Sequence, residues 1–176
     1  MRSLRFRALL VFVSAFVFSG CGVDLSGKNT ESQQDEGYWF CKLAFSYDHP
    51  TRIEDFLADS EWGLGRLRDV MTQDCLSSFT AKMEACSAAI KRDEFRCLHE
   101  SQVNAPADQD GVWFCQLDYS YNDGFATRGE RIVGDTASSR STAIGNVFDD
   151  CASTRQDKRD GCSEAILDGA LVCGVR

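Results

Sequence analysis

The chain has 176 residues, and its 27 acidic residues outnumber its 19 basic ones to give a formal net charge of −8 at pH 7. Residues 1–20 contain three arginines and no acid, so the remaining chain carries a net charge of −11. Binding to nucleic acid requires a basic face, so this acidity argues against a nucleic-acid partner. It is compatible with a protein partner that is itself basic.

The first 20 residues have the three-part form of an export signal. Arg2, Arg5 and Arg7 supply a positive start, and residues 8–18 form an apolar core. This core is about 11 residues long, whereas a helix that spans a bilayer needs about 20. The pattern therefore predicts a signal peptide over residues 1–20 rather than a transmembrane helix.

A cysteine follows this segment in the sequence Ser19-Gly20-Cys21. The segment resembles the lipobox of bacterial lipoproteins, in which a small residue precedes a cysteine that becomes the acylated N-terminus. Phe18 departs from that pattern, because the family usually has an aliphatic residue there. The resemblance covers residues 1–21 and implies lipidation of Cys21, with palmitate as an acyl group. It also implies a lipid-anchored location in the bacterial cell envelope.

Gly22 rather than aspartate follows the lipidated cysteine, which in this family favours the outer membrane. Ordinary signal cleavage near this point is the alternative, and it would give a periplasmic or secreted protein. Residues 21–36 are polar and contain no aromatic residue after the cysteine, so we expect a flexible tether there.

The rest of the chain is a tandem duplication of one small cysteine module. The cysteines of the first copy are spaced by 34, 11 and 11 residues, and those of the second by 36, 11 and 11. We expect module 1 over residues 37–98, a linker over residues 99–110 and module 2 over residues 111–176. Alignment of the copies places the two-residue difference in a turn, between residues 48–50 and 122–126.

Each module begins with a predicted strand, because aromatic and apolar residues alternate with others from Trp39 and again from Trp113. We expect a second strand near residues 52–57 and 128–133. A helix should follow, with Ser60 or Ser139 as its N-cap and the second cysteine at its end.

The stretch that carries the third cysteine is ambiguous. Its apolar spacing is helical in module 1, but residues 152–161 of module 2 are polar, and Gly161 and Gly169 disfavour a helix. Because duplicated modules should share a fold, we expect a loop to the third cysteine and a short strand to the fourth in both copies. The predicted class is α+β, a tandem duplication of a small disulfide-stapled strand–strand–helix–strand module.

The eight module cysteines favour disulfides over zinc, since structural zinc sites use cysteines two to four residues apart and the closest spacing here is 11. Modules of about 60 residues have small cores, and bridges would stabilise them by about 3–4 kcal/mol each. Four cysteines allow three pairings per module. We prefer the nested one, Cys41–Cys97 with Cys75–Cys86 and Cys115–Cys173 with Cys151–Cys162. No metal or cofactor is expected.

Acids at equivalent positions of the two copies are Glu54 and Glu130, Asp59 and Asp135, and Asp74 and Asp150. We expect Asp59 and Asp135 to favour the start of the helix that follows them. Asp74 and Asp150 are expected to form structural salt links with Arg52 and Arg128.

Four aromatic residues form the candidate binding surface: Phe40, Phe114, Tyr47 and Tyr121. Alternation places Phe40 and Phe114 on the strand face opposite the cysteines, so each must pack against the other module, its own helix or a ligand. Tyr47 and Tyr121 end the first strands, where they close the core or offer a contact surface.

Two functions compete on these observations. The sequence contains no catalytic motif that identifies a reaction, and this favours a non-enzymatic envelope lipoprotein, a binding or structural module whose acidity suits a basic protein partner. The alternative is an exported hydrolase that uses carboxylates such as Glu54 and Asp59. A concave site between the modules with converging carboxylates would favour the hydrolase, and a flat aromatic face would favour the binding protein.

Overall fold

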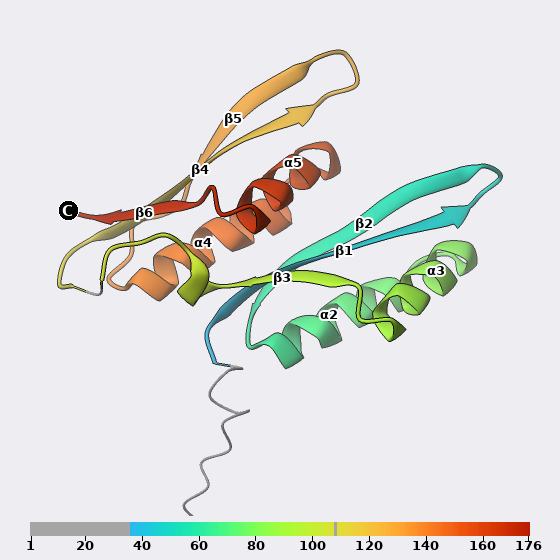
Figure 1. Cartoon of the computed structure of the whole chain (residues 1–176), viewed down its shortest axis with the longest axis horizontal. Helices are drawn as coiled ribbons and strands as arrows, with labels where there is room; N and C mark the ends of the chain where they lie inside the picture. The colour runs from blue at the N-terminus through green and yellow to red at the C-terminus, as the bar shows by residue number, and fades with distance from the viewer. Residues whose placement is uncertain (1–35, 108) are drawn as a thin grey trace, which may run out of the picture.

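The computed structural model describes residues 36–107 and 109–176, which form two modules of mixed α and β structure (Figure 1). The expected signal peptide, Cys21 and the tether up to residue 35 lie outside the described residues. Within the described part of the chain, no helix combines the length and the apolar character needed to cross a membrane.

Each module is a three-stranded antiparallel sheet with two helices, and the first strand of the module is the central one. Module 1 contains β1 (Tyr38–Asp48), β2 (Arg52–Trp62), α2 (Leu64–Leu76), α3 (Thr80–Lys91) and β3 (Phe95–His99), and the 3-10 helix η1 (Glu100–Gln102) follows. Module 2 contains β4 (Trp113–Asn122), β5 (Thr127–Val133), α4 (Arg140–Ser153), α5 (Gln156–Leu167) and β6 (Val172–Val175). The predicted duplication of a strand and helix module is therefore confirmed.

The expected loop to the third cysteine is wrong, because helices α3 and α5 carry Cys86 and Cys162. The module is strand–strand–helix–helix–strand. Gly161 disfavours a helix by propensity, yet α5 requires it: a Cβ there would lie 2.1 Å from the carbonyl oxygen of Ser120 in β4. Gly169, with φ of +80°, follows the end of α5 instead of interrupting it.

The two-residue difference between the copies does not lie in one turn. The pair Asp48↔Arg52 leaves three residues in the first hairpin loop, and Asn122↔Thr127 leaves four in the second. The second extra residue lies after β5, where the register changes between Gln116↔Val133 and the bridge that Ala137 forms. This is a β-bulge, and it makes Asp55 rather than Glu54 the structural counterpart of Glu130.

The helix starts differ between the modules. Ser60 lies inside β2, which runs five residues beyond the predicted end of this strand, and the N-cap of α2 is Gly63 without a side-chain hydrogen bond. Ser139 does cap α4, since its hydroxyl accepts a hydrogen bond from the backbone N–H of Thr142 at 3.2 Å. The predicted cap is therefore confirmed in module 2 and wrong in module 1.

The elements stack in four layers: α2 and α3, the sheet of module 1, α4 and α5, and the sheet of module 2 (Figure 1). The first core lies between sheet 1 and its own helices, where Cys41 and Leu43 are fully buried. The second core surrounds α4 and α5 and includes Phe40, Ala58 and Leu98 from the opposite face of sheet 1. Sheet 1 is therefore covered on both faces, and the modules share a core.

Four disulfides join the cysteines within modules, and none of them crosses between modules. Their pairing is the nested one expected from the sequence. Cys41 lies directly opposite Cys97 in the ladder between β1 and β3, with Cα atoms 4.2 Å apart. The inner bridge of module 1 instead ties α2 to α3, with the Cα atoms of Cys75 and Cys86 5.7 Å apart. The outer bridge thus holds the sheet and the inner bridge holds the helix pair.

The segment between the modules is packed against module 2. Val103 is buried in the shared core, and Asn104 forms a parallel bridge with Val172. The guanidinium of Arg140 donates hydrogen bonds to the carbonyl oxygens of Glu100 and Val103. These contacts fix the path of the chain from one module to the next.

Candidate binding surfaces

Phe40 lies in the contact between the modules. Its side chain is fully buried, and its ring centroid is 5.5 Å from that of Phe148 on α4. Of the choices open from the sequence, packing against the other module is therefore the one that the structure shows for Phe40. This residue is not available to a ligand.

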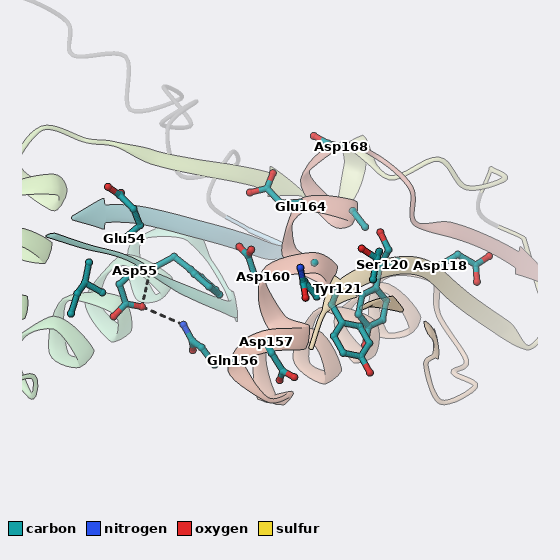
Figure 2. Close-up of a pocket in the computed structure, with 17 residues that line it drawn as sticks. Glu54, Asp55, Asp118, Ser120, Tyr121, Gln156, Asp157, Asp160, Glu164 and Asp168 are labelled. Carbon is teal, nitrogen blue, oxygen red and sulfur yellow. Dashed lines mark hydrogen bonds between the residues drawn. The ribbon is translucent and has the colours of Figure 1, made fainter. Parts of the chain in front are cut away.

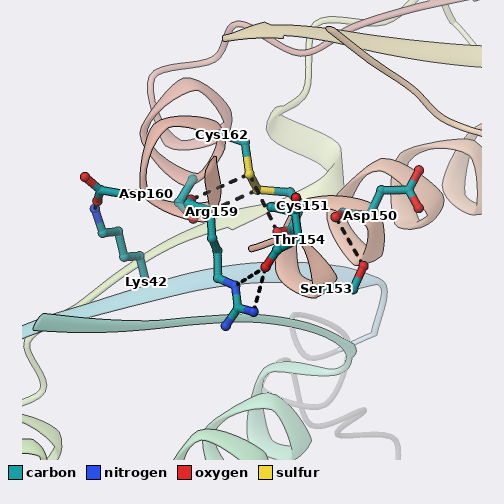
Figure 3. The surroundings of a disulfide bond; sticks show 9 residues. Lys42, Asp150, Cys151, Ser153, Thr154, Arg159, Asp160 and Cys162 are labelled. Carbon is teal, nitrogen blue, oxygen red and sulfur yellow. Dashed lines mark hydrogen bonds and ion pairs between the residues drawn. A yellow bond between two sulfur atoms is a disulfide. The ribbon is translucent and has the colours of Figure 1, made fainter. Parts of the chain in front are cut away.

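A buried lysine forms the polar centre of the same contact. Lys42 is 7% exposed, and its ammonium donates to Asp160 of α5 at 2.6 Å (Figure 3). It also donates to Glu164 of α5 at 2.5 Å. The ammonium also lies 4.7 Å from the ring centroid of Phe56. Arg96 of β3 pairs with Glu164 at 2.7 Å. We call this group, Lys42, Arg96, Asp160 and Glu164, the module clamp.

The pKa of one acid in the module clamp is shifted by its partners. The ammonium of Lys42 holds the pKa of Glu164 below its ordinary value, partial burial opposes this shift, and Arg96 adds to it. The carboxylate of Glu164 is therefore charged at neutral pH, which the buried ammonium requires because an unpaired buried charge is costly.

The counterpart of Phe40 has a different environment. Phe114 is half-buried on the outward face of sheet 2, where the guanidinium of Arg176 lies 4.8 Å from its ring centroid. Val133 and Val172 flank the same face and are 60% and 49% exposed. We call this face, formed by Phe114, Gln116, Val133 and Val172, the open sheet face.

A cleft of about 890 Å³ lies between the two hairpins and α5 (Figure 2). Its apolar lining includes Ile53, Phe56, Tyr121 and Ala165. Seven acidic residues line it: Glu54, Asp55, Asp118, Asp157, Asp160, Glu164 and Asp168. Its lining residues include no lysine and no arginine.

The cations that pair with these carboxylates are placed behind or beside the cleft. Asp118 accepts from Arg131 at 2.5 Å, and Asp157 pairs with Arg155 at 2.7 Å. These guanidinium groups lower the pKa of Asp118 and of Asp157. These two carboxylates are therefore charged at neutral pH, and each is already paired with a cation.

The two tyrosines of the candidate surface occupy different positions. Tyr47 is partly buried against the first core and meets Phe79 edge-on, with ring centroids 5.3 Å apart. Tyr121 packs on the second core, lines the cleft and lies 5.3 Å from the ammonium of Lys158. Beside it, burial together with Glu130 raises the pKa of Tyr119 to about 12, so this phenol stays neutral.

The carboxylates named for a hydrolase do not come together. Glu54 and Asp59 are five residues apart on β2, so their side chains lie on opposite faces, and the strand separates them by about 16 Å. Burial raises the pKa of Asp59, but this residue does not line the cleft. The expected helix-start role of Asp59 is also wrong, because the residue lies within a strand.

The expected salt links of Arg52 and Arg128 are wrong. Arg52 pairs with Glu54 at 2.8 Å, and Arg128 pairs with Asp123 at the loop of the second hairpin. Asp150 is exposed, and its pKa is raised by partial desolvation and by Asp135 and other nearby acids.

Among the described residues, no group of three or more histidine, cysteine, aspartate or glutamate side chains is arranged to hold a metal ion. Comparison of the chain with known protein families, with curated proteins and with solved structures found no match.

Sequence reasoning identified Phe40, Phe114 and Tyr121 but missed the cleft and the module clamp. The acids of α5 give no recognisable motif, because they lie in the segment for which we expected a loop. A helix over that segment would have placed Asp160, Glu164 and Asp168 on one face at a spacing of four residues. This four-residue spacing is visible in the sequence, but it indicates a common face only if the segment is taken as a helix.

Proposed function

We propose that this chain is a non-enzymatic lipoprotein of the bacterial cell envelope that binds a basic segment of a protein partner. The cleft between the hairpins carries this proposal, since it combines seven acidic lining residues with an apolar floor that includes Phe56 and Tyr121. Its volume lies within the usual range of ligand sites, about 300–1,000 Å³. Residues of both modules line this cleft, so a single module could not form it.

A basic segment fits the chemistry of this cleft. Lysine or arginine side chains that enter would meet carboxylate oxygens, while their methylene groups would lie on the aromatic floor. The negative charge of the chain would also speed the approach of a basic partner.

The binding test is a pull-down from envelope extracts with soluble residues 22–176. The double variant Glu54→Lys/Asp168→Lys reverses two exposed charges of the cleft and should weaken capture about tenfold, since exposed ion pairs contribute up to about 1 kcal/mol each. Asp74→Lys is the matched control, because Asp74 is exposed and lies outside the cleft. Equal capture by the parent and the double variant would refute the cleft as the binding site.

The anchor has its own test. Cys21→Ala should release the protein from the membrane or stall its precursor, and mass spectrometry of the native N-terminal peptide should show the added acyl mass. Normal membrane retention of Cys21→Ala, with no added mass in the parent, would contradict lipidation.

A hydrolase is the second candidate, because the cleft is a concave site with carboxylates between the modules, the arrangement expected for one. A carboxylate that acts as a general acid needs a pKa raised toward the working pH. The pKa values of Asp118, Asp157 and Glu164 are lowered instead. NMR titration of the cleft carboxyls decides between the proposals: a carboxyl that titrates above about pH 6 supports the hydrolase.

A further inference from the structure

The two modules are arranged as successive repeats of a stack. Figure 1 shows them in nearly the same orientation, with both hairpins pointing the same way and each helix pair on the same side of its sheet. In the contact between them, α4 and α5 of module 2 cover the outward face of sheet 1. A further contact of this kind would join the open sheet face of one module to the outward side of an α2–α3 helix pair.

The open sheet face lacks the polar surface that is usual at the end of a stack of repeats. The end of a repeat array usually has a polar outer face, which keeps the array soluble. Here Val133 and Val172 are 60% and 49% exposed, and Phe114 is half-buried, whereas the equivalent Ala58 and Phe40 are buried in sheet 1. No element of the described residues packs over this face in the way that α4 and α5 pack over sheet 1.

We propose that a second copy of this chain covers the open sheet face with its α2–α3 pair, in the geometry that α4 and α5 use on sheet 1. The charged positions of the internal contact support this occupant. Gln116 and Val172 replace the two cations of the clamp, Lys42 and Arg96, on the sheet side.

The helix side has changed in the complementary way. At the positions equivalent to Asp160, Glu164 and Asp168, the α2–α3 pair and the turn after it carry Glu84, Ala88 and Arg92. Ala88 would therefore face Gln116 and Val172 at the centre of the contact, while Glu84 keeps an acid at the position of Asp160, whose side chain is 58% exposed in the internal contact. An acid at the position of Ala88, where α5 has Glu164, would lie unpaired against a sheet without cations.

A polar pair at the edge of the internal contact also has polar residues at its equivalent positions in the proposed contact. In the internal contact, the hydroxyl of Ser60 donates to the carboxylate of Asp149. The equivalent residues of the proposed contact are Thr136 on the sheet side and Gln73 on α2, a hydroxyl and an amide that can form a hydrogen bond with each other. Thr72 replaces Phe148, so the contact buries less aromatic surface than the internal one and should be weaker.

Association of this kind joins different faces of the two copies and does not close on itself, so it extends copy by copy. Because successive modules keep one orientation, every copy would place residue 36 on the same side of the stack (Figure 1). A shared membrane anchor on that side would raise the effective concentration of a weak contact. The contact itself does not depend on the anchor or on the acidic cleft.

Sedimentation velocity of soluble residues 22–176 tests the proposal. The parent should show a series of species that grows with concentration up to about 1 mM, the range of weak contacts. Val172→Lys blocks the sheet side and Ala88→Lys blocks the helix side, so each variant alone should remain a monomer. An equimolar mixture of the two should form a dimer and nothing larger, because one sheet face and one helix face remain unblocked.

Two further variants complete the design. Val172→Lys/Ala88→Glu places a cation and an acid at the positions of Arg96 and Glu164 in the internal clamp, and association should recover at least tenfold relative to Val172→Lys. Phe125→Lys, at the 96% exposed tip of the second hairpin, is the control and should associate like the parent. Circular dichroism and unchanged disulfides verify that each variant is folded.

Three results would overturn the proposal. The first is a parent that stays monomeric throughout, both in solution and as the lipidated protein on vesicles. The second is association that Val172→Lys leaves unchanged, which would place the contact elsewhere. The third is a mixture of the two lysine variants that contains no dimer.

Discussion

Replacement of Lys42 by glutamine should uncouple the two modules. The side chain joins sheet 1 to α5 through two carboxylates, at 2.6 Å and 2.5 Å, and through the ring of Phe56. Glutamine is the residue that module 2 carries at the equivalent position, Gln116, so a strand of this kind accommodates it. The substitution therefore removes the charge without an obvious conflict with the strand.

The size of the effect follows from the exposure of each partner. Removal of one member of a buried ion pair costs about 3–5 kcal/mol, whereas an exposed pair contributes about 0–1 kcal/mol. Lys42 is buried, but the side chains of Asp160 and Glu164 are 58% and 41% exposed and can regain water. Glu164 also keeps Arg96 as a partner. We therefore expect Lys42→Gln to lower the free energy of unfolding by about 1–3 kcal/mol.

The assay is equilibrium unfolding in urea of residues 22–176 with all disulfides intact. Arg96→Gln is the control, since its side chain is 55% exposed, and it should cost less than about 1 kcal/mol. A double-mutant cycle of Lys42→Gln with Glu164→Gln should show a coupling energy of about 1 kcal/mol. If Lys42→Gln unfolds within about 0.3 kcal/mol of the parent, the clamp does not hold the modules together and the reasoning is wrong.

Three further outcomes are expected from the same unfolding assay. The pKa of Glu164 is lowered in the folded protein, so the stability that this carboxylate contributes is complete above its ordinary pKa of 4.5 and is lost as the pH falls through its pKa in the folded state. The urea midpoint should therefore drop between about pH 5 and pH 3, and Glu164→Gln should reduce that drop. Gly161→Ala places a methyl group 2.1 Å from a main-chain oxygen of β4 and should cost about 1–3 kcal/mol or more, whereas Gly129→Ala, with no atom within 4 Å, should stay within about 0.5 kcal/mol. Phe40→Ser should cost at least about 3 kcal/mol because the ring is fully buried, and Phe114→Ser less than about 1.5 kcal/mol in the monomer; equal costs would contradict the assigned packing.

The cysteine spacing and the strand alternation were sufficient to predict the framework of each module. Both are local patterns: a strand places Cys41 and Leu43 on one face, and the equal spacing of the two ladders identifies the repeat. The nested pairing was a preference among three, and the structure confirms it by placing Cys41 and Cys97 on adjacent strands and the inner pair on adjacent helices.

The apolar spacing of module 1 was helical, but the second helix of module 2 could not be predicted in this way because polar contacts hold α5. Its outward side carries Asp160 and Glu164, which pair with a buried lysine of the other module. Its inward side needs Gly161 for close approach to β4. Charged residues and a glycine are both unfavourable signs for a buried helix when its partner surface is unknown. The cleft was missed for the same reason, since α5 forms one of its walls.

The β-bulge after β5 was also outside the reach of alignment. A gap of two residues is most simply placed in one turn, where polar residues tolerate length changes. The structure instead divides the gap between the hairpin loop and the bulge near Gly134. Sequence identity at the flanking positions cannot distinguish a single two-residue gap from a divided one, because both alignments keep the cysteines aligned.

Phe40 and Phe114 show how position in the stack decides the role of equivalent residues. Both project from the outward face of a first strand, and the sequence around each is nearly the same. One is fully buried because a helix pair follows it in the stack, and the other is half-buried at the end of the described chain. The cation two residues further along distinguishes them: Lys42 is present where the next helix pair supplies acids, and Gln116 stands where the available helix pair carries Ala88 instead. The residues at this position therefore specify which helix pair each sheet accepts, and they predict that exchange of the two, as Lys42→Gln or Gln116→Lys, weakens the contact at either sheet.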